Sequence, residues 1–147
     1  MKKEFVMRGM TASGETEVLN FSGNKPGYAY RLTEFKLYAS SGIGTAVHEA
    51  YGTITAGKTA VAPTDPNFND EGLIATAAST HQQESYASDH YSVINDTYLI
   101  TQNLILMVQD TGANGTPVNW QCRFVSEKMN GPEEAATNYK QFLISDE

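Results

Sequence analysis

The sequence predicts an all-β fold: a two-sheet antiparallel sandwich, jelly roll or Greek key, with at most one short helical turn near the C-terminus. Only 18% of the 147 residues are charged, and uncharged polar residues and glycine replace them, as is typical of β-rich chains. Turn-forming residues recur about every ten residues, as short strands require. No strand–helix–strand rhythm or internal repeat is present. We therefore expect one sandwich domain over residues 1–147.

The clearest strand signal lies at 118–124, where apolar and polar side chains alternate. Val118, Trp120, Cys122 and Phe124 share one face of this segment. Such a period of two predicts a half-buried strand whose apolar face belongs to the core.

A second apolar run lies at 97–109, and its part 104–108 is continuously apolar. A buried helix would give the same run, but the β-rich flanks and the turn formers that follow favour a strand covered on both faces. Asn114-Gly115 favours a tight connection. We therefore expect 97–109 and 118–124 to form an antiparallel pair.

The segment 27–39 predicts a strand whose apolar phase changes once. Apolar side chains occupy even positions from 28 to 32 and then odd positions from 35 to 37. This change indicates a bulge near Thr33 or Glu34. Further strands are expected at 4–10, 15–21, 47–55, 72–79 and 91–94.

The C-terminal segment predicts a short helical turn followed by a closing strand. Pro132 suits the first turn of a helix, and the acidic residues after it suit the positive end of the helix dipole. The segment 139–145 is expected to be the closing strand.

Charge and cysteine content exclude several classes of function. The net charge is −7, and basic residues such as Arg8, Arg31 and Arg123 are scattered, so neither nucleic acid nor an anionic membrane is an expected partner. Cys122 is the only cysteine, which excludes an internal disulfide and fits folding in a reducing cytosol. The basic start is followed by no apolar signal segment.

The best candidate for a metal site is the loop at 65–72. Asp65, Asn67 and Asn69 occupy the first, third and fifth positions of a calcium loop, whose oxygens suit a hard cation. However, Asp70 stands where the sharp turn needs glycine, and Thr76 where a bidentate glutamate is needed. An ordinary Asx-rich loop is therefore the favoured interpretation, with Asp65, Asn67, Asn69 and Asp70 as a weak candidate only, and no cofactor is expected.

The histidines and their acidic neighbours are the only candidates for acid–base chemistry. His48-Glu49 and Asp89-His90 are adjacent pairs, so on a strand their side chains point to opposite faces and do not share a cleft. His81 has no second histidine at close spacing. We therefore expect surface or edge polar residues, no catalytic residues and no enzyme.

Two other signals are interpreted as structural. Cys122 lies on the apolar face of its strand, so no reactive thiolate is expected. The string Gly52-x-x-x-x-Gly57-Lys58-Thr59 matches a phosphate-binding loop, but Pro63 and Pro66 follow where the motif needs a helix. The match is interpreted as chance.

Four segments, 7–14, 67–74, 91–97 and 117–122, carry a resemblance to a known family. In them the chain resembles the head decoration or capsid-stabilising (cement) proteins of tailed bacteriophages. The resemblance implies a jelly-roll-like sandwich that clamps the major capsid protein on the outer shell, often as a trimer, after folding in the bacterial cytoplasm. No functional residues carry over from that family. Exposed edges and long loops suit a clamp, so we expect contacts at the 63–72 loop and the terminal strands.

Two alternatives remain open. The tyrosines and the calcium-like loop also suit a carbohydrate-binding or adhesion module, in which calcium would stabilise the loop. A small sandwich hydrolase would require the distant histidines to converge. The fold by itself does not separate these functions.

Overall fold

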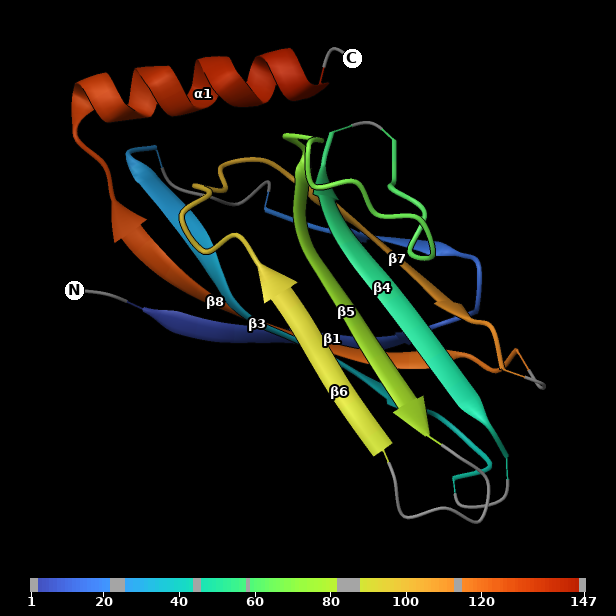
Figure 1. Ribbon diagram of the computed structural model, residues 1–147. Coiled ribbons are helices and arrows are strands. Elements are labelled where there is room, and N and C mark those ends of the chain that lie inside the picture. Colours follow the sequence, from blue (N-terminus) through green and yellow to red (C-terminus); the bar gives the residue numbers. More distant parts are fainter. Residues whose placement is uncertain are drawn as a thin grey trace.

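The computed structural model describes residues 3–21, 26–43, 46–57, 59–81, 88–112 and 115–145. It is a β-sandwich with a helix lying across one end (Figure 1). The predicted fold class is therefore confirmed. The elements are β1 (Glu4–Thr11), β2 (Thr16–Leu19), β3 (Tyr28–Ala39), β4 (His48–Ala56), β5 (Leu73–His81), β6 (Ser88–Ile94), β7 (Leu104–Asp110), β8 (Val118–Lys128) and α1 (Gly131–Ser145).

The two sheets have the strand orders β1-β8-β3 and β2-β7-β4-β5-β6, and every strand pair is antiparallel. The chain alternates between the sheets from β1 to β4 and crosses again between β7 and β8. This order is that of a jelly roll. One strand differs from the regular jelly-roll arrangement: β6 packs against β3 but forms its hydrogen-bonded pair with β5.

The predicted pairing of 97–109 with 118–124 is wrong. β7 pairs with β2 and β4, whereas β8 pairs with β1 and β3. Each strand turns its fully buried face toward the space between the sheets, so the two strands face the same core from opposite sides. The other face of β7 is only half-buried, since Ile105 and Met107 are partly exposed.

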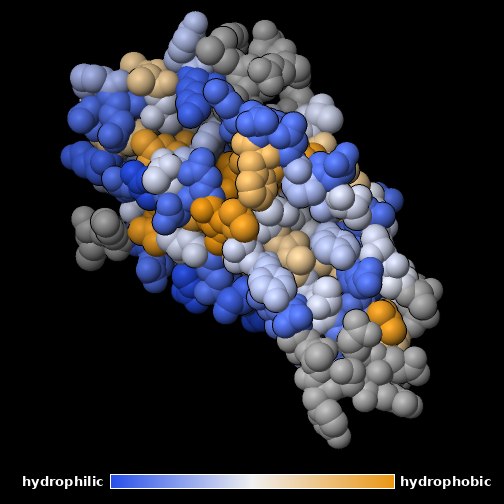
Figure 2. Space-filling view, in the orientation of Figure 1, coloured by the Kyte–Doolittle hydropathy of each residue, from blue (hydrophilic) through white to orange (hydrophobic). Residues whose placement is uncertain are grey.

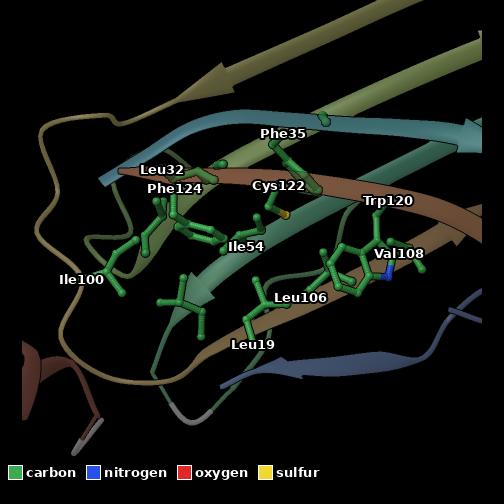
Figure 3. Close-up of a cluster of buried hydrophobic side chains, with 14 of the residues drawn as sticks. Leu19, Leu32, Phe35, Ile54, Ile100, Leu106, Val108, Trp120, Cys122 and Phe124 are labelled. Carbon is green, nitrogen blue, oxygen red and sulfur yellow. The ribbon is translucent and has the colours of Figure 1, made fainter. Parts of the chain in front are cut away.

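The core lies between the two sheets, and Figure 3 shows side chains from both meeting there. Phe35 and Cys122 come from one sheet, while Ile54 and Leu106 come from the other. Val118, Trp120 and Phe124 are also buried, as the alternation predicted. Trp120 donates its indole N–H to Oγ1 of Thr11 at 2.9 Å, which satisfies the one polar atom of its side chain.

The bulge predicted in the third strand is confirmed. The β3–β8 register shifts between Leu32 and Glu34, so Thr33 is the extra residue that moves the apolar phase from even to odd positions. Near the start of β3, Tyr30 and Ile100 exchange backbone hydrogen bonds of 2.9 and 2.8 Å. This bridge joins the connection between β6 and β7 to the edge of the three-stranded sheet.

The closing strand predicted at 139–145 is wrong, because these residues continue the helix α1. Asn130 caps the helix: its Oδ1 accepts from the backbone N–H of Glu133 at 2.8 Å. Glu134 accepts from the backbone N–H of Gly27 at 3.1 Å, which fixes the first turn against the sandwich. None of the described helices combines the length and apolar character needed to cross a bilayer.

Candidate functional site

Three large side chains are exposed along one side of the five-stranded sheet. Tyr91 and Val93 on β6 are 66% and 55% exposed, and Phe68 in the 57–72 loop is 66% exposed. Tyr91 and Val93 share a face of β6, and Phe68 lines the same shallow hollow as Val93. We call these three residues the edge surface. Figure 2 shows this side of the molecule, where hydrophobic residues gather in the middle of the face among hydrophilic ones.

β6 is also an edge strand that lacks the usual features preventing association. Natural edges are usually short, or carry lysine, proline or a bulge that prevents pairing with another chain. β6 has seven residues without lysine or proline, and its pairing with β5 shows no register shift. The opposite edge of this sheet, β2, has only four residues. Among the described residues, no strand pairs with the outer edge of β6.

A second group of polar residues is buried at one end of the core. Nδ1 of His48 lies 3.0 Å from Oδ2 of Asp110, and Thr116 donates to the same oxygen at 3.0 Å. The other oxygen of Asp110 accepts from the backbone N–H groups of Glu49 and Gly112 at 3.1 and 2.9 Å. The group therefore connects β4, the end of β7 and the segment before β8.

Hydrogen bonding keeps Asp110 ionised. Burial by itself would raise the pKa of this carboxyl, but the bonds from His48, Gly112, Glu49 and Thr116 together hold the pKa below its usual value. His48 is 1% exposed, and its Nε2 has no hydrogen-bond partner among the described residues. This geometry suits a structural polar group inside a core.

The prediction that His48 is a surface or edge residue is therefore wrong. His48 follows the same period of two as Ala50, Gly52 and Ile54, which line the core. Asp110 likewise continues the buried phase of Val108. The alternation of buried side chains along β4 and β7 is therefore the sequence signal that could have predicted the burial of His48 and Asp110.

The histidines come closer together than their spacing suggested. His48 lies directly opposite His81, with ring centroids 6.4 Å apart. His90 lies opposite Ser79, and its Nδ1 is 2.9 Å from the Ser79 hydroxyl. All three histidines thus lie on the same face of the five-stranded sheet, although His48 is buried and His90 is exposed. Asp89 is exposed on the other face of β6.

The loop that carries the weak metal candidate uses its side chains for local turns. Asn67 Oδ1 accepts from the backbone N–H of Asn69 at 3.0 Å, and Asp70 Oδ1 accepts from that of Gly72 at 2.9 Å. These are Asx turns. Asp65 is exposed. Among the residues that the structure describes, no three His, Cys, Asp or Glu side chains gather as ligands for one metal ion.

The remaining sequence signals fall in regular structure. Residues 52–56 of the glycine-containing string belong to β4, and no helix follows them in the described part of the 59–81 segment. Lys58 lies outside the described residues. Cys122 is fully buried, and burial raises the pKa of its thiol.

No model of a known protein family matches the chain, and no curated protein matches it either.

Proposed function

We propose that the protein is a non-enzymatic structural protein of a virion, which binds the outer surface of a phage capsid through protein–protein contacts. The edge surface is the observation that carries the proposal. Exposed aromatic and aliphatic side chains beside an open strand edge are typical of a surface that a second protein covers. The sequence resemblance identifies the kind of partner as the major capsid protein.

Two further features support this role. The 63–72 loop was expected to make contacts, and it carries Phe68, the most exposed phenylalanine among the described residues. The net charge of −7 suits a protein that faces solvent on the outside of a large particle, because like charge keeps such particles apart.

The edge can also receive a second copy of the chain. A partner strand that pairs with β6 would satisfy its free backbone N–H and C=O groups and cover Tyr91 and Val93 on one face. Self-association through this edge would give a homo-oligomer, and pairing of β6 with β6 of a second copy would make it a dimer.

The test uses the chain and shells of the major capsid protein encoded by the same genome. Sedimentation of the mixture measures how much of the chain travels with the shells, and light scattering measures the mass of the chain alone. We expect co-sedimentation with the wild-type chain. The variant Val93→Lys places a charge at the open edge and should weaken binding to the shells, self-association or both by roughly tenfold or more.

Val18→Lys is the matched control, because Val18 is 63% exposed on β2 at the opposite edge of the same sheet. It should behave like the wild-type chain. A chain that does not travel with the shells would contradict the proposed function. Equal loss in both variants would contradict the assignment of the contact to the edge surface.

A further inference from the structure

A hollow of about 880 Å³ spans the outer face of the three-stranded sheet and reaches β6. Its size is within the range of small-ligand sites. We call it the outer-face hollow. It is lined by Arg8, Met10, Lys36, Tyr38, Asn119 and Gln121 from the sheet and by His90 and Tyr91 from β6, among other residues.

The six sheet residues form two rows across the strands. Residues directly opposite each other in antiparallel pairs share a face, and the register pairs β8 residues with β1 on one side and β3 on the other. One row has cationic ends and the other apolar ends, with an amide at the centre of each. The rows, in the order β1–β8–β3, are Arg8–Gln121–Lys36 and Met10–Asn119–Tyr38.

The hollow is cationic although the chain is acidic. None of the described residues that line it is Asp or Glu, whereas Arg8 and Lys36 are both cations. Glu34, in the adjacent row, accepts from Nε2 of Gln121 at 3.2 Å, so the amide oxygen of Gln121 is the group left for a ligand hydroxyl. Oε2 of Glu34 lies 3.8 Å from Nζ of Lys36 and 4.0 Å from Nε of Arg123. The side chain of Arg8 has no ion pair or hydrogen bond with any residue that the structure describes. Its guanidinium is therefore available to bind a carboxylate in bidentate fashion.

The aromatic part of the hollow is held in place before any ligand binds. The ring of Tyr38 is parallel to that of His90, with an interplanar angle of 7° and centroids 6.0 Å apart. The hydroxyl of the buried Ser79 in turn fixes His90. Tyr38 is 53% exposed, so it presents a flat ring to solvent at little conformational cost on binding.

We propose that the outer-face hollow binds an acidic saccharide, with the carboxylate at Arg8, a sugar ring against Tyr38, and hydroxyl groups at Asn119 and Gln121. A peptide is the weaker candidate. The centre of the hollow lies over β8, whose backbone groups are paired with β1 on one side and β3 on the other, so an extended peptide gains no main-chain hydrogen bonds there. A sugar needs only side-chain amides, a charge and a flat aromatic surface, and these are the groups present.

The test is a titration of the full chain with acidic saccharides, each beside its uncharged counterpart. Suitable probes are oligomers of galacturonate, glucuronate and mannuronate against their methyl esters, and sialyllactose against lactose. Isothermal titration calorimetry measures the affinity, and the fluorescence of Trp120, the only tryptophan and a core residue of the strand that carries Asn119 and Gln121, is a second readout. At least one acidic probe should bind roughly tenfold more tightly than its neutral counterpart, and added salt should weaken it.

Three variants locate the site. Arg8→Gln removes the charge at similar side-chain length and should reduce affinity roughly tenfold, and Tyr38→Ser should reduce affinity for acidic and neutral probes alike. Arg123→Gln is the matched control, because Arg123 lies on the same face in the adjacent row but does not line the hollow. It should bind like the wild-type chain. Far-ultraviolet circular dichroism checks that each variant is folded.

Three results would overturn the proposal: no binding of any acidic probe at about 10 mM, equal affinity for acidic and neutral probes, or equal loss in Arg8→Gln and Arg123→Gln. Tighter binding of hexaglutamate than of every saccharide would assign the hollow to an acidic peptide instead. The Val93→Lys variant should still bind the saccharide, so failure of this proposal and of the capsid role are distinguishable.

Discussion

The imidazole of His48 and the carboxylate of Asp110 join β4 to β7 by side chains inside the sandwich, with 3.0 Å between Nδ1 and Oδ2. Asp110→Asn should lower the free energy of unfolding by about 3 kcal/mol at neutral pH. The substitution removes a charged acceptor, and the buried groups that donate to it are left with a weaker, neutral acceptor. Urea denaturation followed by circular dichroism measures this change. A loss below about 0.5 kcal/mol, the level of an ordinary surface substitution, would contradict it.

The same carboxylate predicts how stability depends on pH. Since the pKa of Asp110 is lower in the folded chain than its ordinary value of 3.8, its contribution is fully present above that value. The contribution is lost as the pH falls from there through the lower pKa of the folded state. Between about pH 6 and about pH 3, the wild-type chain should lose more stability than Asp110→Asn. If the free energy of unfolding changed with pH by the same amount in both proteins, Asp110 would not be the source of the pH dependence.

Gly52 leaves room for two core side chains. A Cβ at this position would lie 3.0 Å from Cζ of Phe35 and 3.1 Å from Cδ1 of Leu37. Gly52→Ala should therefore destabilise the chain by about 1 to 3 kcal/mol through overpacking, as measured by thermal and urea unfolding. Gly131→Ala is the control: a Cβ there meets nothing within 4 Å, so its stability should equal or exceed that of the wild-type chain.

Cys122 should be unreactive in the folded protein. Its side chain is fully buried, and burial raises the pKa of the thiol, so little thiolate is available to attack a reagent. Because it is the only cysteine, labelling with iodoacetamide reports the opening of β8 alone. We expect labelling to follow the extent of unfolding as urea is added. Rapid labelling of the folded chain would contradict the burial of this strand.

Asn130 should stabilise the C-terminal helix. Asn130→Ala removes the side-chain oxygen that accepts from Glu133 N–H, and such caps contribute about 1 kcal/mol. The helical part of the circular dichroism spectrum should fall, while the near-ultraviolet signal of Trp120 in the core is retained. Asn130→Asp keeps an acceptor at the cap and should resemble the wild-type chain. Equal spectra for all three proteins would indicate that the cap does not hold the helix.

The sequence predicted which strand faces are buried better than it predicted which strands pair. The alternation from Val118 to Phe124 and the phase change at Thr33 both follow from side-chain direction, which is a local property of extended backbone. Which strands pair with each other depends on whether the connecting segment stays in one sheet or crosses to the other. The 111–117 segment contains a tight-turn signal, yet it carries the chain from one sheet to the other.

The errors at His48 and in the 139–145 segment have different causes. From hydrophobicity alone, histidine and aspartate are expected at the surface. The hydrogen bond between His48 and Asp110 offsets the energetic cost of burying both side chains. A short apolar segment does not by itself distinguish helix from strand, and the cap at Asn130 starts a helix that then continues. The outer-face hollow was not predicted, because its rows require the register of three strands.

The placement of β8 determines when this protein is able to fold during synthesis. β8 is the central strand between β1 and β3, so the three-stranded sheet has no hydrogen-bonded ladder until residues 118–128 have left the ribosome. Until then, the apolar faces of β1 and β3 have only transient partners, and the many long-range contacts favour slow folding. A ribosome that stalls before residue 118 would therefore release a fragment in which β1 and β3 lack their shared neighbour, and such a fragment is expected to aggregate.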